Sequence, residues 1–336
     1  MLTRSMRLSQ KLLVACSALL AVNANGQVPS NSNSDLVKVA AVQINGYDKG
    51  DLPREGYDPV APLLPYIHRA GADGAQLVVF PEYILGHVPV SGDSTERIAA
   101  AAKANEIHVI VGCWEERDDG ALANTALIFD RRGQIVGKYN KTHAAVDNYS
   151  GEPPWTQPLE DKSRDWMLRN DPEWVMESGT DLPVFELDFG KIGILTCYDG
   201  WFPEPARVLS LRGAELIVWI NGRGGSVEDF IVRSTMFQSH VAMIAANQAY
   251  GSGTMIGEPS RGAQILARCE EQGESYISAT INLGQVRHIR SHSRNFAQRR
   301  PDLYGELVAP LRSSEGVKTD LDKNPNQNSG QVVQPQ

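Results

Sequence analysis

The chain has 336 residues, of which 42% are hydrophobic, and its formal charge of −8 corresponds to a pI of about 5.4. This length and apolar content are enough for one large α/β domain. The acidic balance and the lack of a basic stripe exclude a nucleic-acid-binding protein. The sequence has no P-loop, HExxH or CxxC pattern, so nothing in it indicates a phosphate cradle, a metal site or a bound cofactor.

The N-terminal segment 1–24 has the composition of a secretory signal. Three basic residues precede an apolar run at 12–22 that is too short to span a membrane, and a small-residue cleavage site follows. Cleavage would remove three positive charges and no acidic residue, so the formal charge would change from −8 to −11. We therefore expect an exported protein, periplasmic or secreted, without membrane contact after signal removal. A lipoprotein anchored at Cys16 is the less favoured alternative.

The remaining chain divides into a flexible leader at 25–35, a folded domain at 36–312 and a disordered polar tail at 313–336. The mature chain would keep three cysteines, and an odd number leaves at least one free thiol in an oxidising compartment. Cys113 and Cys269 could pair, although both lie in strand-like runs that favour burial as free thiols.

Three segments of similar kind end in residues that could carry chemistry. The apolar run 75–80 leads to Glu82, and a second apolar run ends at Cys197. A hairpin that is expected to turn at 130–133 leads through its second arm to Lys141. Burying a carboxylate at the end of a strand costs free energy unless the group is paired or has a function. In α/β proteins, active sites form where the strands end.

Cys197 lies between the strand 192–197 and a helix expected over 204–212, since Pro205 suits a first helical turn and Gly213 suits the end. The positive end of a helix favours the thiolate form of a nearby cysteine, which makes Cys197 a candidate nucleophile. The alternative is a buried, inert thiol. The glutamate and lysine that end the other two segments favour the nucleophile.

With these residues the chain resembles the nitrilase superfamily of carbon–nitrogen hydrolases over about residues 37–305. The matching motifs are Phe80-Pro81-Glu82, Tyr139-x-Lys141-x-His143, and Cys197-Tyr198-Asp199 followed by Phe202-Pro203-Glu204. The chain departs from the family pattern at Asn140, where Arg is frequent, and at Gln238-Ser239, where Glu-Asn is frequent.

The resemblance implies an α/β fold, a four-layer αββα sandwich in which the site lies between two halves, 37–143 and 181–285. It also implies a homodimer or a higher homo-oligomer, with the 205–211 helix as one candidate surface. It implies no cofactor.

The resemblance further implies a role for each residue of the triad. Cys197 attacks the carbonyl carbon of an amide, and Glu82 accepts the thiol proton and passes it to the departing amine. Lys141 stabilises the oxyanion, together with the backbone N–H of Tyr198. His143 is a possible alternative base, but the position of the glutamate favours Glu82, which leaves His143 a structural role.

The superfamily uses a second glutamate between its lysine and its cysteine, and here we predict Glu173, with Glu177 as the alternative. The intervening segment 144–172 has poor apolar periodicity, so we expect a loop that folds over the site and shapes the substrate pocket. A surface insertion that buries its tryptophans is the other interpretation. We expect substrate contacts from Tyr198, Trp174 and Trp201.

The pair Tyr198-Asp199 is typical of the amidase and carbamoylase branches, whereas nitrilases have Trp-Glu after the nucleophile. We interpret Asp199 as a cap of the following helix, although it could also orient the loop or meet a substrate amine. We therefore expect a cysteine-dependent amidohydrolase that releases ammonia from a small carboxamide or N-carbamoyl compound. The alternatives are nitrile hydrolysis or acyl transfer with the same triad, or a catalytically silent protein that binds amides or acts as an assembly subunit.

Overall fold

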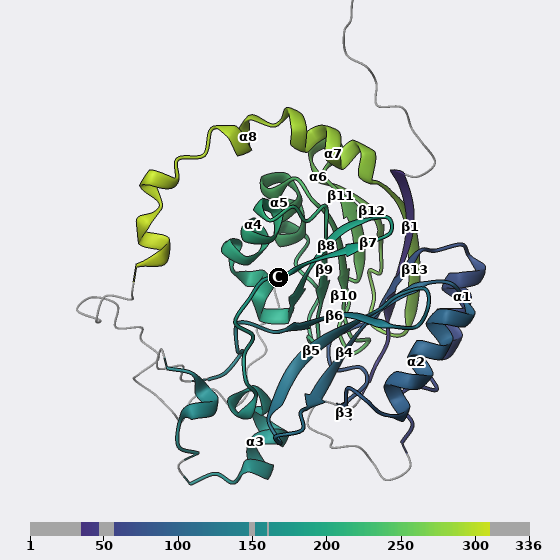
Figure 1. The fold of residues 1–336 in the computed structure, drawn as a ribbon, viewed down its shortest axis with the longest axis vertical. Helices are drawn as coiled ribbons and strands as arrows, with labels where there is room; N and C mark the ends of the chain where they lie inside the picture. The colour runs from purple at the N-terminus through teal and green to yellow at the C-terminus, as the bar shows by residue number, and fades with distance from the viewer. Residues whose placement is uncertain (1–34, 47–56, 148–151, 160, 310–336) are drawn as a thin grey trace, which may run out of the picture. The chain divides into compact units, whose positions relative to one another are not determined.

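The computed structural model describes residues 35–46, 57–147, 152–159 and 161–309. The expected signal at 1–24 and the polar tail at 313–336 therefore lie outside the described residues. The chain separates into two units, one that runs to His292 and one that begins at Ser293. The two sheets and their helices belong to the first unit (Figure 1).

The first sheet holds most of the N-terminal half and one strand from the end of the unit. Its strands are β1 (Leu36–Gln43), β2 (Leu77–Val79), β3 (His87–Pro89), β4 (His108–Glu116), β5 (Leu122–Phe129), β6 (Ile135–Asn140) and β13 (Ser275–Asn282). The strand order is β13-β1-β2-β4-β5-β6, and β3 pairs with β4 beside this path. β13 runs antiparallel to β1, with Val39 opposite Ala279. The expected division into halves at 37–143 and 181–285 is thus wrong for this last strand, which returns to the first sheet.

The second sheet has the order β12-β11-β10-β9-β8-β7. Its strands are β7 (Val184–Leu187), β8 (Gly190–Thr196), β9 (Leu216–Ile220), β10 (Ala242–Ala246), β11 (Met255–Glu258) and β12 (Gln264–Arg268). β8, β9 and β10 are parallel, so the ends of β8 and β9 at Thr196 and Ile220 lie side by side. Cys197 follows directly from this edge.

The layers follow from the alternation of apolar residues along each strand. In β1, Val39 and Ala41 pack with the second sheet, while Ala40 and Val42 pack with helices α1 (Leu64–Ala72) and α2 (Asp93–Ala104). The outer face of the second sheet packs in the same way against α4 (Pro203–Leu211) and α5 (Asp229–Ser239). This gives the expected order of helices, sheet, sheet and helices (Figure 1). The first unit also contains α6 (Ser260–Ala263) and α7 (Leu283–His292).

The segment 144–172 is not the structureless loop that its sequence pattern predicts. It contains the 3-10 helix η2 (Pro154–Thr156) and α3 (Arg164–Asn170), and it leads into η3 (Pro172–Val175). The hydroxyl of Ser163 starts α3 by accepting the N–H of Trp166 at 3.1 Å. A cap sets this short helix, which is why apolar periodicity did not indicate it.

The second unit consists of short helical turns, α8 (Arg294–Ala297), η5 (Pro301–Leu303) and η6 (Gly305–Val308). Its Leu307 and Val308 are 63% and 86% exposed, so these turns have little core of their own. Among the described residues, no helix combines the length and the apolar character needed to cross a membrane.

Candidate active site

Glu82 follows β2 in a tight turn against the neighbouring strand. The next residue, Tyr83, has a positive φ of 62°. A Cβ atom at Gly112 of β4 would lie 2.7 Å from the Cα of Glu82, so only glycine permits this approach. The Glu82 side chain is 2% exposed, and its Oε1 accepts a hydrogen bond of 2.7 Å from Asn124 Nδ2. The turn thus directs a buried carboxylate to one position.

Lys141 continues from the end of β6 and faces the same carboxylate. Its backbone N–H donates to the carbonyl of Asn124 at 2.9 Å, which extends the pairing with β5. Its Nζ lies 3.4 Å from Glu82 Oε1 and 2.5 Å from Glu173 Oε1, and the side chain is 3% exposed. The structure therefore brings the side chains of Glu82, Lys141 and Glu173 together.

Glu173 reaches this cluster from η3. Its Oε1 accepts the hydroxyl of Tyr83 at 2.6 Å, and its Oε2 accepts the backbone N–H of Ala145 at 2.6 Å. Glu177, the alternative, pairs instead with Arg117 at 2.6 Å at the surface. The geometry thus separates the two glutamates, and only Glu173 contacts the lysine.

Cys197 is the first residue of η4 (Cys197–Trp201), and its φ of 46° places it in the left-handed region. Such a conformation is strained for a residue with a Cβ and persists only when its surroundings hold it. Trp219 of β9 provides this support, since its Nε1 donates to the Cys197 carbonyl at 2.8 Å. The indole also packs so closely on Gly200 that a Cβ there would lie 2.3 Å from it.

The charges of the cluster set the protonation states. Burial opposes the positive charge of Lys141, but attraction from Glu173 and Glu82 outweighs it and raises the pKa of Lys141 well above its usual value. Burial also raises the pKa of Glu82, an effect that Lys141 opposes and Glu173 adds to. Lys141 is therefore a cation at neutral pH, placed between two carboxyl groups.

The surroundings of Cys197 favour the protonated thiol, which is the form from which Glu82 is expected to take the proton. Burial and the charge of Glu82 raise the pKa of Cys197 to about 12, and Lys141 offsets only part of this. The positive end of α4 does not help, because η4 separates Cys197 from the start of α4 at Pro203. The thiol is protonated at neutral pH and needs a base, and Glu82 is the carboxylate that acts most strongly on it.

Asp199 does not cap the following helix, α4. Its carboxylate instead forms hydrogen bonds that connect the segment around Lys141 with the turn at Cys197. Its Oδ1 accepts the backbone N–H of Thr142 at 3.2 Å and that of His143 at 2.9 Å, and it lies 2.9 Å from His143 Nδ1. Its Oδ2 accepts the Tyr139 hydroxyl at 2.7 Å and the Thr196 N–H at 3.0 Å. His143 thus has the structural role predicted for it, and its ring also stacks on Phe202.

Replacing Asp199 by asparagine is expected to lower the free energy of unfolding by about 2–4 kcal/mol, because an amide group presents N–H groups to buried donors. Hydrogen bonds from His143 and Tyr139 and the charge of Lys141 outweigh burial and lower the pKa of Asp199. A carboxyl group whose pKa is lowered by folding stabilises the folded state at neutral pH, and this contribution is lost as the pH falls through that pKa. The difference in unfolding free energy between native protein and the Asp199→Asn variant should therefore shrink in acid. Urea unfolding at several pH values measures this. Asp181→Asn, which changes a 63% exposed side chain, is the matched control.

The three residues predicted to contact substrate lie in different surroundings. Tyr198 packs edge-on against Phe202, with ring centroids 5.0 Å apart. Trp201 is 53% exposed and stacks with the guanidinium of Arg223 at 5.0 Å. Trp174 lines a cavity formed within the segment 144–174.

The sequence did not predict three side chains that support the catalytic cluster. Two of them hydrogen-bond its carboxylates, and the third hydrogen-bonds its backbone. Asn124 contacts both carboxylates, Tyr83 contacts Glu173, and Gln248 Nε2 donates to the backbone carbonyl of Glu82 at 2.7 Å. Asn124 carried a signal, since a polar residue inside the buried strand β5 needs partners. Gln248 comes from the second sheet, and nothing local to either segment indicates that contact.

Comparison with known proteins places the chain in a family. The family model for carbon–nitrogen hydrolases matches residues 38–291. The omega-amidase of Xenopus tropicalis is 28% identical over 261 residues, which cover 71% of this chain and 88% of the relative. A carbon–nitrogen hydrolase from Helicobacter pylori has the same fold, with a TM-score of 0.64 and 18% identity over 83% of this chain and 100% of that chain.

An amidase from Nesterenkonia sp. AN1 has a TM-score of 0.58 and 16% identity, and the match covers 80% of this chain and 96% of that chain. In that protein the acetamide moiety of fluoroacetamide is added covalently at the active-site cysteine. The fold of two sheets flanked by helices agrees with these structures, and the family match at residues 38–291 spans more than half of the chain. This chain therefore belongs to the carbon–nitrogen hydrolase family of the nitrilase superfamily.

Proposed function

We propose that the protein hydrolyses a C–N bond in a small carboxamide or N-carbamoyl compound through a thioester on Cys197, with release of ammonia. The observation that carries the proposal is the buried cluster of Glu82, Lys141 and Glu173 beside a cysteine held in a strained turn. Strained backbone conformations and buried charged groups are concentrated at functional sites. The amidases among the relatives support the same reaction class.

Acylation begins with Glu82, which takes the proton of the Cys197 thiol as the sulfur attacks the carbonyl carbon. The negative charge that develops on the carbonyl oxygen is stabilised by Lys141 and by the backbone N–H of Tyr198. When the tetrahedral intermediate collapses, the C–N bond breaks and Glu82 gives its proton to the departing nitrogen. Ammonia leaves, and the acyl group remains on sulfur.

Deacylation repeats the proton transfers with water. Glu82 takes a proton from a water molecule as its oxygen attacks the thioester, the C–S bond breaks, and the proton returns to the sulfur. Glu173 Oε1 lies 2.5 Å from Lys141 Nζ. The role of Glu173 is therefore to position the ammonium group of Lys141 and to keep it charged. The raised pKa of Glu82 brings this base closer to neutral pH, which suits a group that must both accept and return a proton.

Ammonia release from a panel of substrates tests the proposal. The panel comprises aliphatic amides, aromatic amides, N-carbamoyl amines and nitriles, and enzyme blocked with iodoacetamide serves as the background. We expect turnover of one amide or carbamoyl class and none of nitriles, since Tyr198-Asp199 replaces the Trp-Glu of nitrilases. Preferential turnover of nitriles would assign the alternative reaction. Silence across the panel, with Cys197 fully reactive, would favour an amide-binding protein.

We also propose that the chain forms a homodimer or higher homo-oligomer through the outer face of α4 and α5. Phe230 and Phe237 of α5 are 71% and 59% exposed, and Leu211 of α4 is 41% exposed. Exposed aromatic residues two helical turns apart on one helix are typical of an interface. Light scattering on the purified protein tests this, and the mass of a single chain would overturn it.

Export to the periplasm or beyond remains a proposal that rests on the N-terminal sequence. The segment 1–24 lies outside the described residues, so the support is its basic start and its apolar run. N-terminal sequencing of the protein recovered from cells would test it. A chain that still begins at Met1 would contradict cleavage.

A further inference from the structure

The two carboxylate oxygens of Glu82 have different surroundings. Oε1 accepts a hydrogen bond of 2.7 Å from Asn124 Nδ2 and lies 3.4 Å from Lys141 Nζ. Oε2 has no hydrogen-bond partner among the described residues. Asn124 and Lys141 thus fix Oε1 in place, and Oε2 is the oxygen left to exchange protons with the thiol, the departing nitrogen and water.

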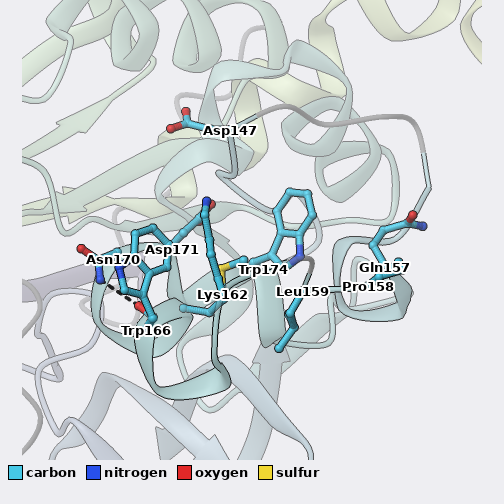
Figure 2. A pocket seen from close by; sticks show the side chains of 10 residues that line it. Asp147, Gln157, Pro158, Leu159, Lys162, Trp166, Asn170, Asp171 and Trp174 are labelled. Atoms are coloured by element: carbon cyan, nitrogen blue, oxygen red, sulfur yellow. Dashed lines mark hydrogen bonds between the residues drawn. The ribbon is translucent and has the colours of Figure 1, made fainter. Parts of the chain in front are cut away.

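Gly222, two residues after the end of β9, shows which groups surround Oε2. A Cβ atom at Gly222 would lie 3.1 Å from Glu82 Oε2, 3.3 Å from Tyr250 Oη and 3.5 Å from Gln248 Nε2. None of these groups lines the cavity shown in Figure 2, whose walls come from residues 147–174. Because Oε2 and Oη both lie this close to one point, they are no further apart than about two hydrogen-bond lengths, which one bridging water can span.

Tyr250 lies in the loop between β10 and β11, and contacts with other segments fix its position. Its backbone N–H donates to Asn45 Oδ1 at 2.8 Å, which connects this loop with the segment that follows β1 in the first sheet. The next residue, Gly251, packs so closely on Arg223 that a Cβ there would lie 2.1 Å from the Arg223 carbonyl oxygen. The Tyr250 hydroxyl has no hydrogen-bond partner among the described residues, so it is available to a bound molecule.

The Tyr250 hydroxyl is a neutral phenol at the pH at which the base works. Burial, together with the charges of Glu82 and Cys197, raises the pKa of Tyr250 above its usual value of 10.0. Tyr250 therefore keeps its proton and does not compete with Glu82 as the base. Its oxygen still has lone pairs that accept a hydrogen bond.

We propose that Tyr250 is a further catalytic residue, whose hydroxyl oxygen and Glu82 Oε2 together bind the nitrogen that leaves and the water that replaces it. This proposal rests on the proposed function and deepens it. In acylation, the nitrogen of the tetrahedral intermediate accepts the proton of Glu82 Oε2 while one of its own N–H groups donates to Tyr250 Oη. The C–N bond then breaks, and ammonia leaves.

Water occupies the same place in deacylation. It donates one hydrogen to Glu82 Oε2 and the other to Tyr250 Oη, which leaves an oxygen lone pair for the thioester carbon. Glu82 takes the first proton as the C–O bond forms. The C–S bond then breaks and that proton passes to the sulfur, while Tyr250 neither gains nor loses a proton.

Tyr250→Phe tests this role, because it removes the hydroxyl and keeps the ring. p-Nitrophenyl acetate acetylates a reactive cysteine without an amide, so the decay of acetyl-Cys197, followed by intact-protein mass, measures the attack of water by itself. We expect this decay to be about three- to tenfold slower in the variant, which is the effect of one lost neutral hydrogen bond. Tyr276→Phe is the matched control, because the partly buried Tyr276 of β13 packs on the helix side of the first sheet.

Methanol separates a catalytic role of Tyr250 from a structural one. Its single hydroxyl hydrogen goes to Glu82, so it has none left to donate to Tyr250. Acetyl-enzyme in aqueous methanol yields methyl acetate beside acetate, and we expect the ratio of methyl acetate to acetate to rise about three- to tenfold in Tyr250→Phe. Equal slowing of both products, with an unchanged ratio, would overturn the catalytic role.

Gly222→Ala tests the same place from the other side. The added methyl group would lie 3.1 Å from Glu82 Oε2 and 3.3 Å from Tyr250 Oη, where it crowds the bound water or nitrogen. Ammonia release and decay of the acetyl group should both fall by at least about tenfold. Gly224→Ala is the matched control in the same loop, since a Cβ there would meet no atom within 4 Å, and it should keep native rates.

The acetyl group also distinguishes failure of this proposal from failure of the reaction. Native enzyme that carries no more acetyl group than Cys197→Ala would overturn the proposed function, and the role of Tyr250 with it. An acetyl group on Cys197 that decays equally fast in native enzyme and in Tyr250→Phe would overturn the role of Tyr250 and keep the hydrolase.

Discussion

Replacement of Cys197 by alanine is expected to reduce amide hydrolysis by at least about ten-thousand-fold, because no thioester can form. Ammonia release measures the loss, and intact-protein mass detects the acyl group that native enzyme should carry during turnover. Cys113→Ala is the matched control, since Cys113 is fully buried in β4 and its pKa is raised by burial. Residual activity within about tenfold of native enzyme would exclude Cys197 as the nucleophile.

The reactivity of the thiol supplies a second measurement for the same prediction. A thiol with a pKa of about 12 is inert toward iodoacetamide at neutral pH unless a base assists it. We expect alkylation of native enzyme to rise with pH as Glu82 loses its proton, at a pKa above its usual value of 4.5. Glu82→Gln should remove this rise and leave only the titration of the thiol at high pH. Unchanged alkylation in that variant would mean that another group is the base.

Replacement of Lys141 by methionine is expected to cost both activity and stability. Activity should fall by at least about 10²–10³-fold, because the developing oxyanion loses a charged donor. The free energy of unfolding should fall by about 3–5 kcal/mol, because two buried carboxylates lose their shared cation. Steady-state kinetics and urea unfolding measure the two losses.

The pH dependence of that destabilisation has a definite sign. Without Lys141 the pKa of Glu82 in the folded protein should lie further above that of the unfolded chain, because burial raises this pKa and Lys141 opposes the rise. The folded state then binds more protons, so the stability of the variant falls as the pH rises. The stability difference from native enzyme should be smaller near about pH 5 than near about pH 8. A difference independent of pH would contradict the shared-charge account.

Two further variants separate the roles of the lysine. Lys141→Met combined with Glu173→Gln removes one of the two carboxylates and should recover part of the stability and none of the activity. Lys138→Met also takes a cation from a buried carboxylate, since Lys138 pairs with Glu115 at 2.5 Å. Lys138 contacts neither Glu82 nor Glu173, so this variant should be less stable and fully active per folded molecule.

The sequence predicted the strand ends well because the signals are local. Two apolar runs lead to Glu82 and Cys197, and the second arm of a hairpin leads to Lys141. The charges of Glu82 and Lys141 both act on Cys197 in the structure. Glu173 came from resemblance rather than from pattern, and the contact with Lys141 agrees with it. The four layers also followed from resemblance, while the alternation in β1 gives them a physical basis.

The features that the sequence did not predict depend on contacts between distant parts of the chain. Nothing within β13 indicates that it pairs with β1. Asp199 could be placed on the turn after Cys197, but its partners at residues 139–143 become visible only when the two sheets meet. The raised pKa of Cys197 likewise follows from burial and from Glu82, and the position of Cys197 before a helix does not reveal it.

The distribution of the cluster over two sheets has a consequence for the newly made chain. Glu82 and Lys141 belong to the first sheet and Cys197 to the second, and the first sheet is complete only when β13 at Ser275–Asn282 has joined β1. A growing polypeptide that has passed Cys197 therefore carries the thiol before the first sheet is complete. We expect chains that terminate before β13 to lack an activated nucleophile, so that hydrolysis begins only after synthesis is nearly finished.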